Sequence, residues 1–76
     1  MTDEQIRTAI LDLALRRGRG KSFCPSEVAR GLAEDWRPLM PEIRRMAATM
    51  EDIRATRHGK DVLATSPGGP IRLALK

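Results

Sequence analysis

The first apolar stripe in the chain has the period of an α-helix. Its residues recur at the i, i+4, i+7 and i+8 spacing, with two further leucines that widen it: Ile6, Ile10, Leu11, Leu13, Ala14 and Leu15. Thr2 and Gln5 have the spacing of a capping box at the N-terminal end. Gly18 follows two arginines, a combination typical of a helix C-terminus. The pattern therefore predicts a first helix from Asp3 to Arg17.

A short second helix is expected to begin at Pro25. Proline suits the first turn of a helix, because the N–H that it lacks would have no partner there. Val28, Ala29 and Leu32 then form the buried side of this helix. The three residues before it, Ser22–Cys24, lie where a short strand would lead into the helix.

The third helix, expected from about Arg37 to Glu51, has two prolines near its start. Pro38 suits a first turn, whereas Pro41 would clash with the carbonyl four residues before it if regular helix began as early as Trp36. We therefore expect an irregular start, with regular helix from about Pro41. The apolar residues at helical spacing are expected to face inward, namely Leu39, Ile43, Met46, Ala47 and Met50. Trp36, at the upstream end of this face, is expected to be buried.

After the third helix the apolar period shortens to two, as in a strand. Ile53 and Ala55 alternate with polar residues, and the chain then turns at Arg57–Asp61. The Pro- and Gly-rich loop Ser66–Pro70 precedes a second alternating segment, Ile71–Leu75, which is expected to pair with the first. The whole order predicts an α+β fold of the winged helix-turn-helix type. It would contain three helices and a small antiparallel sheet, made of a two-stranded wing and a short third strand.

The size and charge of the chain limit its classes of function. Its 76 residues are expected to form a single domain, residues 1–76, with a small core. Fourteen Lys and Arg against ten Asp and Glu give a net charge of +4 at pH 7, which favours a polyanionic partner. No nucleophile, base and orienting partner come together in the sequence. We therefore expect neither enzymatic activity nor a cofactor.

The single cysteine and the absence of a long apolar run favour a cytoplasmic protein without membrane association. Cys24 is interpreted mainly as a small apolar residue, with a redox role as the alternative, since it precedes a helix N-terminus. His58 has no neighbour at metal-ligand spacing and is interpreted as a turn residue, so no metal site is expected.

The solvent side of the third helix carries the first candidate functional residues. With Ile43 placed inward, the opposite side presents Arg37, Arg44, Arg45, Ala48 and Thr49. Arginine can bind guanine edges or phosphates through two N–H groups, and threonine can reach a base edge. The predicted two-stranded wing adds Arg54, Arg57 and Lys60, which would lie against backbone phosphates. The sequence thus predicts a module that binds duplex DNA, with the helix side chains in the major groove.

Two other interpretations stay open beside DNA binding. Charges on an exposed helix are often only solvated, and Glu51, Asp52 and Asp61 interrupt the basic surface. The chain could instead be a protein-interaction or dimerisation domain that uses the edge of the predicted wing or a methionine-rich surface of the third helix. The methionines concerned are Met40, Met46 and Met50.

Short motifs spread over nearly the whole chain carry a family resemblance. They are Ser22–Arg30, Trp36-Arg37, Met40-Pro41, Ile43-Arg44 and Gly69–Leu73. Together they resemble a family of small bacterial proteins of unknown function that is assigned a winged-helix fold. The resemblance implies this architecture and brings no activity, cofactor or catalytic residue with it. It favours DNA binding only through the general analogy with winged-helix domains.

Overall fold

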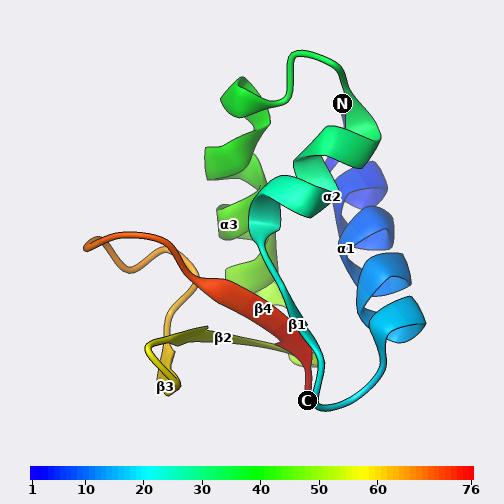
Figure 1. Ribbon diagram of the computed structural model, residues 1–76. Coiled ribbons are helices and arrows are strands. Elements are labelled where there is room, and N and C mark those ends of the chain that lie inside the picture. Colours follow the sequence, from blue (N-terminus) through cyan, green and yellow to red (C-terminus); the bar gives the residue numbers. More distant parts are fainter.

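The computed structural model describes residues 1–76 as three helices packed on one small antiparallel sheet (Figure 1). In chain order the elements are α1 (Asp3–Arg17), β1 (Ser22–Phe23), α2 (Pro25–Leu32), η1 (Arg37–Leu39), α3 (Met40–Thr49), β2 (Ile53–Arg57), β3 (Lys60–Val62) and β4 (Arg72–Leu75). The expected α+β class is confirmed, as are the bounds of α1 and the start of α2. The arrangement is compatible with a winged-helix-like fold.

The sheet has the strand order β1-β4-β2-β3, and all neighbouring strands are antiparallel. The last strand of the chain, β4, is therefore central and pairs with both β1 and β2. Leu73 of β4 lies opposite Phe23 on one side and Ala55 on the other, so an apolar row crosses three strands. The sequence predicted three strands, two in the wing and one more. The structure has a fourth, because Lys60–Val62 pair with the outer edge of β2.

A two-residue turn creates this fourth strand. His58 and Gly59 have φ angles of 53° and 81°, and the flanking residues Arg57 and Lys60 are paired. Positive φ at both central residues is the backbone of a type I′ hairpin turn, whose twist matches that of the strands. The interpretation of His58 as a turn residue is thereby confirmed. The sequence predicts the hairpin, with the apolar pair Val62-Leu63 after the turn, but not β3 as a separate strand, because the strand is short and Val62 is its one residue that packs against the core.

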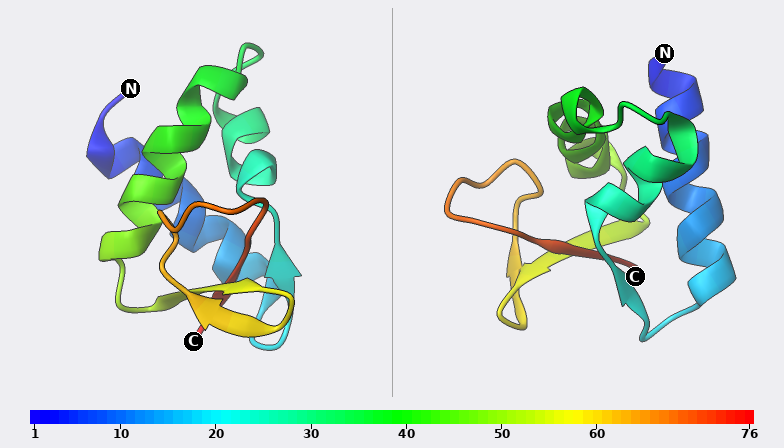
Figure 2. Two further views of the ribbon diagram at one scale, coloured as in Figure 1. Left: turned by 90° about the vertical axis from the view of Figure 1, so that its left-hand side faces the viewer. Right: turned by 45° about the horizontal axis from the view of Figure 1, so that its top comes forward.

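The core lies between the helices and the face of the sheet that they cover (Figures 1 and 2). Its largest fully buried apolar side chains come from α1, β1, α3 and β4: Ile6, Ile10, Phe23, Ile43 and Leu73. The inward face predicted for the third helix is confirmed by the burial of Met46 and Ala47. Leu15, which was expected to widen the apolar stripe of α1, is instead 60% exposed. It lies about 100° around the helix from buried Ala14 and so points away from the core.

The start of α3 follows the irregular course expected from its prolines. Arg37–Leu39 form the 3-10 turn η1, and regular α-helix begins at Met40. The helix ends at Thr49, earlier than the expected limit at Glu51, because the backbone of Met50 is already extended.

Two N-terminal caps fix α1 and α2. The predicted capping box of α1 is confirmed: the Thr2 hydroxyl accepts from the N–H of Gln5 at 3.2 Å, and the Thr2 N–H donates to Gln5 Oε1 at 2.8 Å. In α2 the Cys24 N–H donates to Glu27 Oε2 at 2.8 Å, and Arg17 donates to the other carboxylate oxygen. These bonds, that from Cys24 first, lower the pKa of Glu27 below its ordinary value. The same carboxylate therefore caps α2 and ties it to the end of α1.

Candidate functional site

One face of the molecule is formed by α3 and the wing, a name used here for residues 58–71 between β2 and β4. Seen from this face in the left view of Figure 2, α3 crosses diagonally with the wing below it, and α1 lies behind. The side chains predicted to act on this face are Arg37, Arg44, Arg45, Thr49, Arg54, Arg57 and Lys60. Their positions in the structure fall into three groups.

The first group, Arg44 and Arg57, holds the wing. Arg44 Nε donates to the carbonyl oxygen of Ala64 at 2.7 Å, and its Nη2 donates to that of Ser66 at 2.8 Å. Arg57 Nη2 donates to the carbonyl oxygens of Ser66 and Gly69 at 2.9 and 3.0 Å. Both side chains are half-buried, and neither has a carboxylate partner. We call these two residues the arginine clasp, since they join α3 and β2 to the wing.

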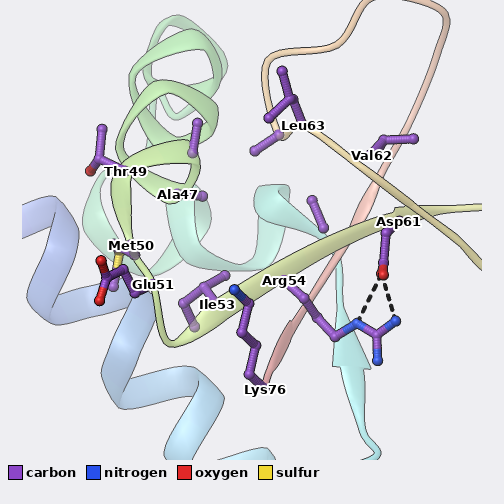
Figure 3. Close-up of a pocket in the computed structure, with 13 residues that line it drawn as sticks. Ala47, Thr49, Met50, Glu51, Ile53, Arg54, Asp61, Val62, Leu63 and Lys76 are labelled. Carbon is purple, nitrogen blue, oxygen red and sulfur yellow. Dashed lines mark hydrogen bonds and ion pairs between the residues drawn. The ribbon is translucent and has the colours of Figure 1, made fainter.

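The second group, Arg45 and Arg54, lies in exposed ion pairs. Arg45 Nη2 is 2.8 Å from Asp3 Oδ1 and 3.1 Å from Glu42 Oε2, so it links α3 to the start of α1. Hydrogen bonds to Asp3 and then Glu42 raise the pKa of Arg45, which keeps its charge at every physiological pH. Arg54 on β2 forms two hydrogen bonds with Asp61 on β3, drawn as dashed lines in Figure 3. The guanidinium groups of Arg45 and Arg54 are therefore both paired with carboxylates of the chain itself.

The third group contains the three remaining side chains, Lys60, Arg37 and Thr49, which contact neither the wing carbonyls nor a carboxylate. Lys60 is exposed beside the hairpin turn and forms no ion pair. The guanidinium carbon of Arg37 lies 4.7 Å from the ring centroid of Trp36. Thr49 differs from both, because its hydroxyl donates to the carbonyl of Met46 in its own helix at 2.8 Å. Arg37 and Lys60 are therefore the predicted cations whose side chains form no hydrogen bond or ion pair within the chain.

Arg30 is a candidate that the sequence reasoning missed. Its guanidinium carbon also lies 4.7 Å from the centroid of the Trp36 ring, and it has no carboxylate partner. Trp36, which was expected to be buried, is half-buried and packs against the edge of the core, so its ring meets both the interior and two arginines. The sequence signal was limited to a tryptophan between two nearby arginines, since Arg30 and Trp36 belong to different elements. We call Arg30, Trp36 and Arg37 the tryptophan cluster.

A groove of about 610 Å³ opens between the C-terminal half of α3 and strands β2 and β3 (Figure 3). Most of its lining is apolar, including Ala47, Ile53 and Val62, and the adjoining Leu63 is 70% exposed. The Arg54–Asp61 ion pair lies along one side of it.

The remaining polar groups offer little chemistry. The half-buried Cys24 accepts a hydrogen bond from the Ser26 hydroxyl at 3.1 Å, and its backbone caps α2. No three His, Cys, Asp or Glu side chains are grouped so that they could hold a metal ion. None of the helices combines the length and the apolar character that a membrane span requires.

Comparison with known proteins places the chain in a family without an assigned activity. The model of the family described as "Protein of unknown function (DUF3253)" matches residues 3–76. The chain therefore belongs to this family. No curated protein matches the sequence.

Proposed function

Starting from a family with no assigned activity, we propose that the chain is a winged-helix nucleic-acid-binding module whose ligand is duplex DNA. The tryptophan cluster is the observation that carries the proposal. It contains two arginines without acidic partners, one in the last turn of α2 and one in η1, which leads into α3. A helix-turn-helix domain approaches the major groove with the start of its third helix.

The tryptophan cluster is suited to this role because its arginines are held in place. An arginine stacked on an indole ring is attracted by the electrons of the ring and loses less side-chain freedom on binding than a free one. Trp36 is itself packed against the core, so the stacked groups are fixed relative to α3. Planar guanidinium groups in such positions bind phosphate or guanine edges through two parallel hydrogen bonds.

The wing supplies the second contact in this proposal. Lys60, exposed at the start of β3, is proposed to bind a backbone phosphate. Arg45 and Arg54 would contribute after exchange of partner, because exposed ion pairs are weak and a phosphate competes for the guanidinium group. The net charge of +4 favours the encounter with a polyanion.

Fluorescence anisotropy with a labelled duplex of mixed sequence, over a salt series from about 50 to about 200 mM, tests this proposal. We expect the logarithm of the affinity to fall linearly with the logarithm of the salt concentration. Arg30→Ala and Arg37→Ala should each weaken binding by about 1–3 kcal/mol and reduce the salt slope by about 1. Arg16→Ala is the matched control, since it removes one equal charge from the far end of α1.

Two results would remove the proposal. One is the absence of binding at the lowest salt concentration. The other is an equal loss of affinity in the Arg16 and Arg37 variants, which would show that only the net charge of the chain matters.

A protein-binding function is the second candidate, and the apolar groove beside α3 favours it. Leu63 lines this groove and is 70% exposed, so it extends the apolar surface that a partner could cover. Light scattering over a concentration series would detect self-association, and Leu63→Ser should abolish it if the groove forms the interface.

A further inference from the structure

We propose that the arginine clasp, Arg44 and Arg57, binds one phosphate group at the junction of α3, β2 and the wing. The proposal rests on the proposed function in one respect, since it takes the ligand to be a backbone phosphate of duplex DNA. It names a contact that lies apart from the tryptophan cluster.

The first argument is the charge of the clasp. The Nη2 atoms of Arg44 and Arg57 both lie within 2.9 Å of one carbonyl oxygen, that of Ser66, so two cationic groups are close neighbours. Their acceptors are carbonyl oxygens and one hydroxyl, which carry no net charge. Like charges at this separation repel, and an anion would relieve the repulsion. Both side chains are half-buried, where solvent screens their field less than at an open surface.

The second argument is the set of N–H groups that remain free. Arg44 forms its hydrogen bonds through Nε and Nη2 only, so Nη1 has no acceptor. Arg57 Nε is enclosed and has no partner at all. A buried donor without an acceptor is costly, and the guanidinium group provides more donors than the loop carbonyls use. Phosphate oxygens are the acceptors that match this fork geometry best.

The third argument is the absence of a side chain at Gly68, which lies beside Arg57. Gly68 has a φ angle of 118°, and a Cβ atom built on it would lie 3.6 Å from Arg57 Nη1 and 3.8 Å from Cζ. A side chain at this position would therefore pack against the guanidinium group, whereas glycine leaves this approach to Nη1 uncovered.

The position of the clasp selects the source of the phosphate. Arg44 belongs to α3, and the carbonyl groups that it binds belong to the wing. These two elements lie together on one face of the molecule (Figure 2). A phosphodiester between a helix in the major groove and a wing on the adjacent backbone would reach the clasp.

The test is thermal unfolding of the full chain in inorganic phosphate, with sodium chloride at the same ionic strength as reference. Wild type should show a saturable rise in Tm of roughly 4–8 °C when phosphate is present at several times its Kd. Arg44→Gln and Arg44→Lys should lose most of this rise, because the first removes the charge and the second removes the fork. Arg16→Gln, with the same loss of charge at a distant site, should keep it. A Tm that rises equally in chloride, or an equal rise in Arg44→Gln, would overturn the proposal.

Duplex DNA forms the second arm of the experiment. If the clasp binds a phosphodiester, Arg44→Gln should reduce the salt slope of DNA affinity by about 1, because it removes one cation that neutralises a phosphate. If phosphate stabilises the chain while duplex DNA does not bind, the clasp is a site for free phosphate and the proposed function fails alone. If DNA binds with an unchanged slope in the Arg44 variants and phosphate has no effect on Tm, the clasp proposal fails and the proposed function stands.

Discussion

Phe23 shows how much of this small core depends on single side chains. It is fully buried and belongs to the two-residue edge strand β1. Its partner in the sheet is Leu73 of the inner strand β4. The chain has no other phenylalanine and no tyrosine. Because the interior is close-packed, no neighbouring ring can fill the space that Phe23 occupies.

Phe23→Ala is therefore expected to lower the free energy of unfolding by about 3–5 kcal/mol. Urea denaturation followed by circular dichroism measures this change. Leu15→Ala, which also truncates a large apolar side chain but at a position 60% exposed, should change stability by less than about 0.5 kcal/mol. Similar losses in the two variants would mean that burial does not determine the effect.

Glu27 makes stability depend on pH at the scale of one side chain. Its pKa is lowered in the folded state by the Cys24 N–H and by Arg17. A group with a depressed folded pKa stabilises the protein above its unfolded pKa, and this stabilisation is lost as pH falls through the folded pKa.

Glu27→Gln is expected to be less stable than wild type at pH 7, by about 1 kcal/mol or less, since the carboxylate is partly exposed. The difference should shrink as pH falls below about 4.3, the ordinary pKa of Glu, and vanish once Glu27 is protonated in the folded protein. Urea midpoints of both proteins between pH 7 and pH 3 would measure it. A difference that does not change with pH would show that the charge of Glu27 plays no part.

At the scale of elements, the wing is determined by backbone conformation and by the two arginines that hold it. Its hairpin turn needs positive φ at His58 and Gly59, and the later loop needs it at Gly68 and Gly69. Glycine adopts such angles at little cost, whereas other residues are strained there. The carbonyl groups of the loop then turn toward Arg44 and Arg57.

Substitutions at the two central residues of the hairpin turn are expected to change stability in opposite directions. Gly59→Ala should lower stability by about 1 kcal/mol, because alanine is strained at a φ of 81°. His58→Asn should raise Tm slightly, since Asn-Gly is the preferred pair for this turn. Thermal unfolding of the two variants decides the matter, and a stabilised Gly59→Ala would contradict the turn geometry.

The elements were largely predictable from the sequence, whereas the contacts of the candidate site were not. Periodicity identifies an element because the spacing of Ile6 and Ile10, or of Ile53 and Ala55, is a local property of the chain. The partners of Arg44 are 20 and 22 residues away, in a loop that contains four consecutive proline and glycine residues. No spacing rule connects such residues. A helical wheel gives the direction of Arg44 and cannot show that a loop occupies that direction.

The same limit explains Arg30 and Trp36. They belong to different segments of the helix-turn-helix, and the stacking of arginine on the ring depends on how α2 and η1 meet. The sequence contains the residue types, and only the packing of two elements brings them together.

At the scale of the whole molecule, the order of strands makes the C-terminal segment indispensable. β4 lies between β1 and β2, and the Lys76 N–H also donates to the Asp52 carbonyl at 2.8 Å. Without β4, β1 would have no strand partner, and the buried Leu73 would leave a cavity beneath the helices.

A chain shortened to residues 1–71 is accordingly expected to lose cooperative unfolding and dispersed amide signals in NMR spectra. Removal of the exposed Met1 is the matched control and should leave both unchanged. Retention of a sharp thermal transition in the shortened chain would show that the helices are stable without a closed sheet.

The central place of β4 also has a consequence for biosynthesis. Synthesis runs from the N-terminus, so the helices and β2 are made before the strand that joins the sheet together. Until β4 pairs, β1 has no strand partner and β2 has one open edge, and unpaired strand edges favour aggregation. The sheet can therefore close only after residues 72–75 have been made.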